Sequence, residues 1–133
     1  MPRYSAMETD KKKILIVDDN ADSRELVMKI LKNTNYQLSD AIDGEDALNK
    51  INADKPDLIL MDISMPKIDG YELTRRLKKE KDLRDIKIIA LTAHAMKGDK
   101  EKALASGFLG YIAKPINVRM FGEQIKNFLN TPE

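Results

Sequence analysis

Five polar residues, placed where apolar runs of this sequence end, have side chains suited to metal or phosphate chemistry. They are Asp18, Asp19, Asp62, Thr92 and Lys114. Each alone has an ordinary explanation, because an aspartate caps a turn, a threonine caps a helix and a lysine is solvated at the surface. Their common position at the ends of apolar runs favours one shared site.

The three aspartates would repel one another at a shared site unless a cation lay among them. Two like charges about 4 Å apart cost about 4 kcal/mol at an effective dielectric of about 20. The chain has no cysteine and one histidine, so the ligands are oxygens and the ion should be hard. A few carboxylates, completed by water and a phosphate, suit Mg²⁺ better than Ca²⁺. The Thr92 hydroxyl and the Lys114 ammonium could then hold phosphate oxygens.

The strands that position these residues follow from the apolar runs. Residues 58–61 are large and apolar and lie between Pro56 and Pro66. This pattern favours a strand buried on both faces, although a buried helical turn is also compatible with it. Further strands are predicted at residues 14–17, 36–41, 86–91 and 109–113.

The stretches that follow the five strands predict five helices. Four of them have apolar stripes: Leu26, Val27, Ile30 and Leu31; Ala47, Leu48 and Ile51; Leu73 and Leu77; and Phe121, Ile125, Phe128 and Leu129. The helix expected from about residue 97 to residue 106 offers only Ala103, Leu104 and small residues for burial. We therefore expect a marginal, mobile helix there.

Strands that alternate with helices predict an α/β fold with a parallel sheet and right-handed crossovers. A flavodoxin-like (βα)5, doubly wound parallel sheet with strand order 2-1-3-4-5 fits the count. In that order the ends of strands one and three flank the switch point at which open sheets bind ligands. Asp18, Asp19 and Asp62 would converge there.

Composition narrows the classes of function. The chain has 133 residues, 42% hydrophobic and 34% charged, which indicates a single soluble globular domain. The net charge of +1, from 23 basic and 22 acidic residues, gives no reason to expect nucleic acid or a membrane as partner. No apolar run approaches a membrane span, and residues 1–5 lack the apolar core of a signal peptide, so a cytoplasmic location is expected.

Four segments resemble the receiver domain of two-component response regulators. They are Asp18-Asp19, Met61-Asp62-Ile63-Ser64-Met65-Pro66, Leu91-Thr92-Ala93 and Tyr111-Ile112-Ala113-Lys114-Pro115. Thr92 lies 30 residues and Lys114 lies 52 residues after Asp62, as in receivers. We interpret residues 1–11 as a flexible leader, residues 12–129 as the receiver domain, and residues 130–133 as a tail too short for an output domain.

The resemblance implies that Asp62 accepts a phosphoryl group from a phosphohistidine. It implies that Asp19, Asp62 and the backbone carbonyl of Ser64 bind Mg²⁺ directly, with Asp18 acting through water and with Mn²⁺ able to take the place of Mg²⁺. Lys114 would offset charge on the phosphoryl oxygens. No enzymatic activity is expected beyond Mg²⁺-dependent self-phosphorylation and autodephosphorylation.

The same resemblance implies a switch. The Thr92 hydroxyl moves toward the phosphoryl group, the Tyr111 ring turns inward, and the face formed by residues 97–129 becomes a surface for a downstream protein. Ser64 and the rim residue His94 would tune the access of hydrolytic water to the acyl phosphate. The Lys114-Pro115 bond is expected to be cis, which an X-Pro bond permits at a cost of about 0.5 to 1 kcal/mol.

Residues 91–99 look most like receivers of hybrid histidine kinases and of stand-alone regulators of the cell-division type. The expected partners are therefore a histidine kinase or a histidine phosphotransfer protein. Two alternatives stay open at this point. One is an aspartyl-phosphate phosphatase, although Ser64 stands where that class needs a second aspartate. The other is an adaptor with a receiver fold that acts independently of phosphorylation.

Overall fold

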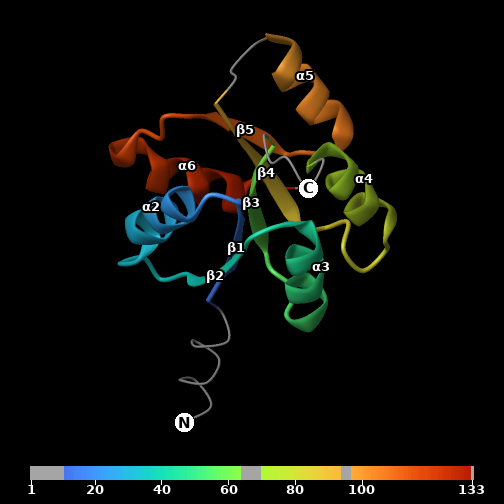
Figure 1. Ribbon diagram of the computed structural model, residues 1–133, viewed down its shortest axis with the longest axis horizontal. Helices are drawn as coiled ribbons and strands as arrows, with labels where there is room; N and C mark the ends of the chain where they lie inside the picture. Colours follow the sequence, from blue (N-terminus) through green and yellow to red (C-terminus); the bar gives the residue numbers. More distant parts are fainter. Residues whose placement is uncertain (1–10, 64–69, 94–96, 133) are drawn as a thin grey trace.

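The computed structural model describes residues 11–63, 70–93 and 97–132, apart from the side chains of Lys97 and Asp99. Labels follow Figure 1. The strands are β1 (Lys13–Val17), β2 (Gln37–Ala41), β3 (Leu58–Asp62), β4 (Lys87–Thr92) and β5 (Gly110–Ala113). The helices are α2 (Ala21–Leu31), α3 (Gly44–Ala53), α4 (Gly70–Lys79), α5 (Lys97–Ser106) and α6 (Val118–Asn130).

The strands form one parallel sheet in the order β2-β1-β3-β4-β5, which confirms the predicted doubly wound fold. Helices α2 and α6 cover one face of the sheet, and α3, α4 and α5 cover the other (Figure 1). Each crossover returns the chain to the same edge, so every strand ends at the edge at which the others end. This edge is where the candidate residues lie.

Each central strand is apolar at nearly every position because both of its faces are covered. In β1, Leu15 and Val17 pack on the side of α3, α4 and α5. Ile14 and Ile16 pack on the side of α2 and α6. All five residues of β3 are buried, including its last residue, Asp62. The fold therefore delivers a carboxylate to the end of a fully buried strand.

Local signals start and end the helices near the site. The Asn20 side chain accepts a hydrogen bond from the Ser23 amide at 2.9 Å and so caps the amino terminus of α2. Asp43 caps α3 in the same way through the Asp46 amide. Gly107 follows Ser106, the last residue of α5, and has a φ of 109°. Glycine adopts this left-handed conformation without steric cost, so it allows the chain to turn away at the end of the helix.

Two burial predictions were wrong. Leu26 in α2 is 45% exposed and Leu104 in α5 is 47% exposed. Among the described side chains of α5, Ala103 and Ser106 are buried. The scarcity of buried apolar side chains in α5 agrees with the sequence pattern, and its mobility stays a prediction.

Polar and cationic contacts hold α5 against α4. The Lys102 ammonium lies 4.4 Å from the centre of the Tyr71 ring, a favourable cation–π position. An Arg75 Nη1 donates to the Ser106 hydroxyl at 3.4 Å. Phe108, just beyond α5, meets the Tyr71 ring edge to face. The contacts of Lys102 and Ser106 are cationic or polar. Among the described side chains of α5, Ala103 belongs to the buried apolar cluster.

None of the helices in the described part of the chain has the length and apolarity needed to span a lipid bilayer.

Candidate functional site

The carboxyl ends of four strands bring the candidate residues to one edge of the sheet. Asp18 follows β1, Asp62 and Thr92 end β3 and β4, and Lys114 follows β5. Asp62 is in register with Leu91 of β4, and Thr92 is in register with the last residue of β5. Parallel pairing alone therefore places side chains from distant parts of the chain together.

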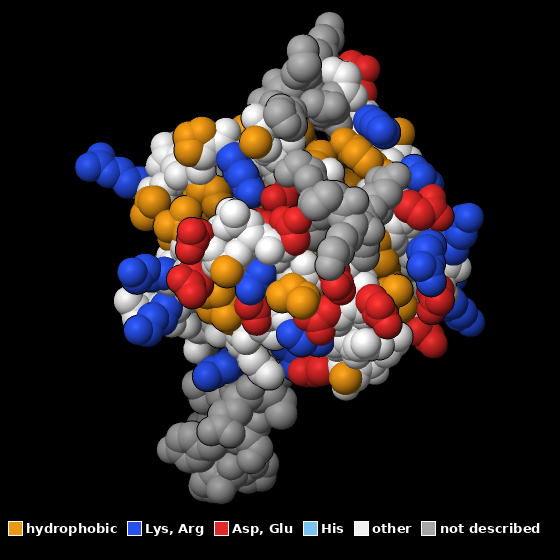
Figure 2. Space-filling model, viewed as in Figure 1, with side chains coloured by type: hydrophobic (Ala, Val, Ile, Leu, Met, Phe, Trp, Pro, Cys, Tyr) orange, Lys and Arg blue, Asp and Glu red, His pale blue; other side chains and the backbone are white. Residues whose placement is uncertain are grey.

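Three carboxylates form the centre of this site. One oxygen from each of Asp18, Asp19 and Asp62 lies within 4.8 Å of the other two. Asp18 is 1% exposed and Asp62 is 5% exposed, whereas Asp19 faces solvent. Figure 2 shows acidic side chains interspersed with basic and hydrophobic ones on the face that it views, so burial distinguishes this cluster from ordinary surface charge.

Lys114 brings a positive charge to the buried pair. Its Nζ donates to Asp62 Oδ2 at 2.9 Å and lies 3.4 Å from Asp18 Oδ2. Burial by itself lowers the pKa of Lys114, but the hydrogen bonds and charges of the two aspartates outweigh burial, so the pKa is raised. The ammonium therefore stays protonated beside the carboxylates.

The pKa of the Asp18 carboxyl is raised above its ordinary value. Burial raises its pKa, and the charge of Asp62 raises it further, against the opposing effects of the Asn20 amide and Lys114. Among the residues that the structure describes, three carboxylates gather at this site and the Lys114 ammonium is the cation paired with two of them, so negative charge is in excess there. The donor set is made of carboxylate oxygens, so the residues fit a hard divalent cation such as Mg²⁺.

Some of the remaining predicted residues lie in the described part of the chain, and others lie outside it. Thr92 is buried, at 2% exposed, and Tyr111 is half-buried against the apolar cluster beneath α3, α4 and α5. The Lys114-Pro115 peptide bond is cis, the isomer that the resemblance leads us to expect. Ser64 and His94 lie outside the described residues, so the structure places neither of them.

A mostly apolar hollow of about 140 Å³ borders the acidic cluster. It is lined by Asp18, Ser23, Leu26, Val27, Lys114, Pro115 and Ile116. Leu26, which the sequence pattern assigned to the core, forms part of this wall. The hollow lies between α2 and the loop after β5, beside the Lys114 ammonium.

Sequence reasoning missed one residue that touches the acid pair. Arg24, in α2, donates from Nη1 to the backbone carbonyl of Asp18 at 2.8 Å and from Nε to Asp40 Oδ2 at 3.0 Å. The available signal was an arginine in the helix that follows the two aspartates. That signal does not identify Asp40, a residue of β2, as its partner.

Comparison with known proteins assigns the family. The sequence matches the family described as response regulator receiver domain over residues 14–126. The chain belongs to this family. The polar-differentiation response regulator DivK of Brucella anthropi is 42% identical over 118 residues, a match that covers 89% of this chain and 96% of that protein.

Solved structures agree with the receiver assignment. A response regulator from Chloroflexus aurantiacus superposes with a TM-score of 0.86 at 30% identity, covering 92% of this chain and 100% of that one. The chemotaxis protein CheY4 of Vibrio cholerae gives a TM-score of 0.83 at 27% identity, covering 89% and 98%. The flavodoxin-like sheet is thus the receiver fold.

Membership in the family carries general properties. Receivers accept a phosphoryl group, and this is the standard function of the family. They bind Mg²⁺ at an acidic pocket, and they exchange signals with histidine kinases or phosphotransfer proteins and with downstream targets. The family is one of signalling domains in two-component systems rather than of enzymes that turn over external substrates.

Proposed function

We propose that this receiver accepts its phosphoryl group on Asp62, from a phosphohistidine of a histidine kinase or a phosphotransfer protein. The observation that carries the proposal is the position of the Lys114 Nζ, 2.9 Å from the Asp62 carboxylate, beside two further carboxylates. A buried nucleophile at a strand end, paired with a fixed ammonium, is what transfer to a carboxylate requires.

The reaction is a displacement at phosphorus. An oxygen of Asp62 forms a bond to phosphorus while the bond from phosphorus to the histidine nitrogen breaks, and the electron pair of that bond returns to the imidazole. The product is an acyl phosphate on Asp62. The ammonium of Lys114 lies within contact distance of the same carboxylate, so it can stabilise the charge on the transferred group.

Asp19, Asp62 and the carbonyl of Ser64 would hold Mg²⁺, with Asp18 contributing through water. When bound, the ion supplies a Lewis acid that stabilises negative charge on the phosphoryl oxygens. The support in this chain is the cluster of carboxylate oxygens and its excess negative charge. Mn²⁺ has the same preference for oxygen ligands and can take the place of Mg²⁺.

On phosphorylation, movements of the Thr92 and Tyr111 side chains would change the position of α5. Thr92 ends the strand next to β3, and Tyr111 is half-buried in the strand beyond it. Helix α5 lies against α4 and β5, and among its described side chains Ala103 is the one that belongs to the apolar core, so a small change in these contacts can reposition the helix. The face of residues 97–129 would then bind the downstream protein.

Incubation with Mg²⁺ and acetyl phosphate, a small phosphodonor, tests this function. The intact mass should increase by one phosphoryl group in the wild-type protein and stay unchanged in the Asp62→Asn variant. A chelator should abolish the increase. Phosphorylation of the Asp62→Asn protein to the wild-type extent would refute the assignment, and sustained hydrolysis of an external phosphate ester would favour the phosphatase alternative.

A further inference from the structure

Asp18 and Asp19 pose a geometric problem, because they are consecutive and yet serve one site. Successive side chains of an extended strand point to opposite faces. An oxygen of each aspartate nevertheless lies within 4.8 Å of the other and of Asp62. The chain leaves β1 after Val17 and bends at Asp19. The peptide group between the two aspartates must therefore be held in a turned orientation.

Arg24 contacts that peptide group. Its Nη1 donates to the Asp18 carbonyl at 2.8 Å, and this carbonyl belongs to the peptide that joins Asp18 to Asp19. A charged donor makes this hydrogen bond stronger than a neutral one would be. The Arg24 side chain is 16% exposed, so water competes weakly for the carbonyl.

The other polar groups of Asp18 also have partners. Its amide donates to the Ala41 carbonyl at 3.1 Å, which extends the β1–β2 pairing by one residue. Its Oδ1 accepts from the Asn20 amide at 3.0 Å. Its Oδ2 faces the Lys114 ammonium. Arg24 donates to the backbone carbonyl of Asp18. The orientation of this carbonyl sets the plane of the peptide that leads to Asp19, and so the direction of the Asp19 side chain.

Two elements fix the guanidinium itself. Arg24 sits in α2, where its amide donates to the Asn20 carbonyl at 3.1 Å, and its Nε donates to Asp40 Oδ2 at 3.0 Å. Asp40 lies in β2, in register with Ile16 of β1. The fork of arginine donors serves both acceptors at once, which the single nitrogen of a lysine does less well.

We propose that Arg24, held by Asp40, is a positioning residue of the phosphorylation site. It orients the Asp18–Asp19 peptide and so directs the exposed Asp19 carboxylate toward the cation that it shares with Asp62. This inference rests on the proposed function, since it names a residue that shapes the same acidic site. The residue acts on the ligands without touching the cation or the phosphoryl group.

A pair of substitutions with equal change of charge tests the proposal. Arg24→Met removes the contact to Asp18. Lys50→Met removes another cation beside Asp40, because Lys50 Nζ donates to the Asp40 carbonyl and pairs with Asp46 without touching Asp18. Both variants lose one positive charge near β2. They differ in the contact on which the proposal depends.

Two measurements on the full chain are needed. In the metal-free protein, nuclear magnetic resonance should show shifted amide signals and faster hydrogen exchange at Asp19 and Asn20 for Arg24→Met, with little change for Lys50→Met. In a titration with Mg²⁺, Arg24→Met should bind about tenfold more weakly than wild type, the usual size for loss of a group that orients metal ligands. Lys50→Met should stay within about twofold of wild type.

The affinity is measured at a temperature at which both variants are fully folded, so a loss of global stability alone does not change it. Wild-type affinity and wild-type amide signals in Arg24→Met would overturn the proposal, and so would equal losses in the two variants. If Arg24→Met does not fold, Arg24→Lys decides: shifted Asn20 signals and weaker binding support the proposal, and unchanged values refute it. A wild-type protein that binds no Mg²⁺ would instead refute the proposed metal site, while the metal-free amide signals still decide the role of Arg24.

Discussion

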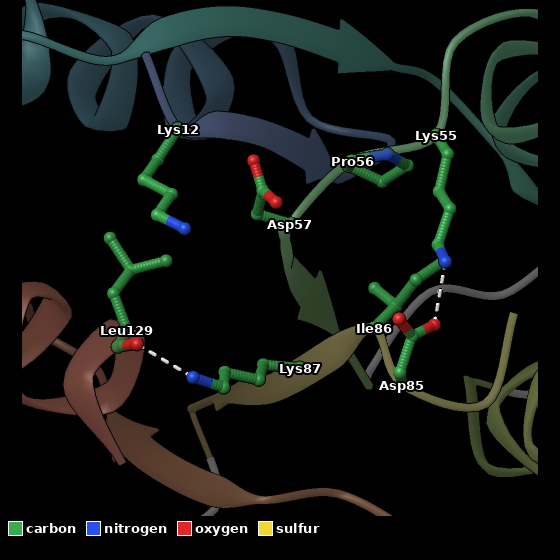
Figure 3. Close-up of a pocket in the computed structure, with 8 residues that line it drawn as sticks. All are labelled: Lys12, Lys55, Pro56, Asp57, Asp85, Ile86, Lys87 and Leu129. Carbon is green, nitrogen blue, oxygen red and sulfur yellow. Dashed lines mark hydrogen bonds and ion pairs between the residues drawn. The ribbon is translucent and has the colours of Figure 1, made fainter. Parts of the chain in front are cut away.

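The two edges of the sheet both bring lysines and aspartates together, but they do so with opposite character. At the carboxyl edge, Asp18, Asp19 and Asp62 meet Lys114 in a mostly buried cluster. At the amino edge, a cavity of about 290 Å³ is lined by Lys12, Lys55, Pro56, Asp57, Asp85, Ile86, Lys87 and Leu129 (Figure 3). The amino edge has the larger hollow and more lysines than aspartates.

The contacts at the amino edge are structural. Lys55 and Asp85 form an ion pair at 2.7 Å with both side chains about half exposed. Lys87 Nζ donates at 2.6 Å to the Leu129 carbonyl, in the last turn of α6 (Figure 3), where a cation is favourable. The Asp57 carboxylate accepts from the Lys13 amide at 2.7 Å and so joins the start of β3 to β1.

The pKa values at the two edges differ in direction. At the amino edge, the hydrogen bond from Lys55 lowers the pKa of Asp85. At the carboxyl edge, burial and the charge of Asp62 raise the pKa of Asp18 despite the nearby Lys114. The edge at which chemistry is expected is therefore the one where carboxylates are buried in excess over cations. The size of the hollow and the number of charged residues do not distinguish it.

The largest expected contrast is between two lysine substitutions. Lys114→Met should slow phosphorylation by acetyl phosphate about 100-fold, because it removes a charged donor beside Asp62. Lys87→Met removes a lysine from the opposite edge and should leave the rate unchanged. Rates followed by intact mass test both variants, and an equal loss in the two would contradict the distinction between the edges.

Mg²⁺ should stabilise the fold through the carboxyl edge alone. At a concentration 100 times its dissociation constant, an ion that binds the native state raises the free energy of unfolding by about 2.7 kcal/mol. Asp19→Asn should remove most of this gain, and Asp57→Asn should retain it. Chemical denaturation with and without a chelator measures the gain, which should not survive in Asp19→Asn if the ligands are assigned correctly.

Asp18→Asn should stabilise the metal-free protein, by on the order of 1 kcal/mol near neutral pH, because it removes a buried charge next to Asp62. The folded protein keeps the Asp18 proton at pH values at which the unfolded chain has lost it. Stability should therefore fall as the pH rises from the ordinary value of 3.8 through the raised pKa. Denaturation across this range should show a shallower fall in the variant, and a destabilised variant would contradict the account.

The smallest effect, of opposite sign, is expected from Asp85→Asn. Loss of its exposed ion pair should cost at most about 0.5 kcal/mol near neutral pH. Because the folded-state pKa of Asp85 is lowered, its contribution is present above the ordinary value of 3.8 and is lost as the pH falls through the lowered pKa. The same denaturation series measures this variant, and stabilisation at neutral pH would remove the contrast with Asp18.

Much of the fold was predictable because the sheet is covered on both faces. A strand in that position is apolar at nearly every residue, so the run of residues 58–61 favoured a strand there over the buried helical turn that it also allowed. Once the strand order was inferred, parallel pairing placed Asp62, Thr92 and Lys114 at one edge without further information. The spacing of apolar residues thus contained both the architecture and the location of the acidic site.

The side-chain contacts between helices and strands could not be predicted from the sequence, because they depend on how each helix packs on the sheet. Leu26 fits the apolar stripe of α2, but its side chain is 45% exposed and lines the hollow beside Lys114. The contact between Arg24 and Asp40 joins a helix to the neighbouring strand, and no periodicity encodes it. The cation–π contact between Lys102 and Tyr71 likewise arises from the packing of α5 on α4.

If Asp62 is the phosphoryl acceptor, the phosphoryl group resides on that residue, and chemical mapping of the modified position tests this. Borohydride reduces an aspartyl phosphate to homoserine, so the protein is phosphorylated with acetyl phosphate and Mg²⁺, reduced, digested and sequenced by mass spectrometry. Homoserine is expected at position 62, and unmodified aspartate is expected at positions 18, 19, 57 and 85. Homoserine at any of those four positions with Asp62 unmodified would contradict this assignment.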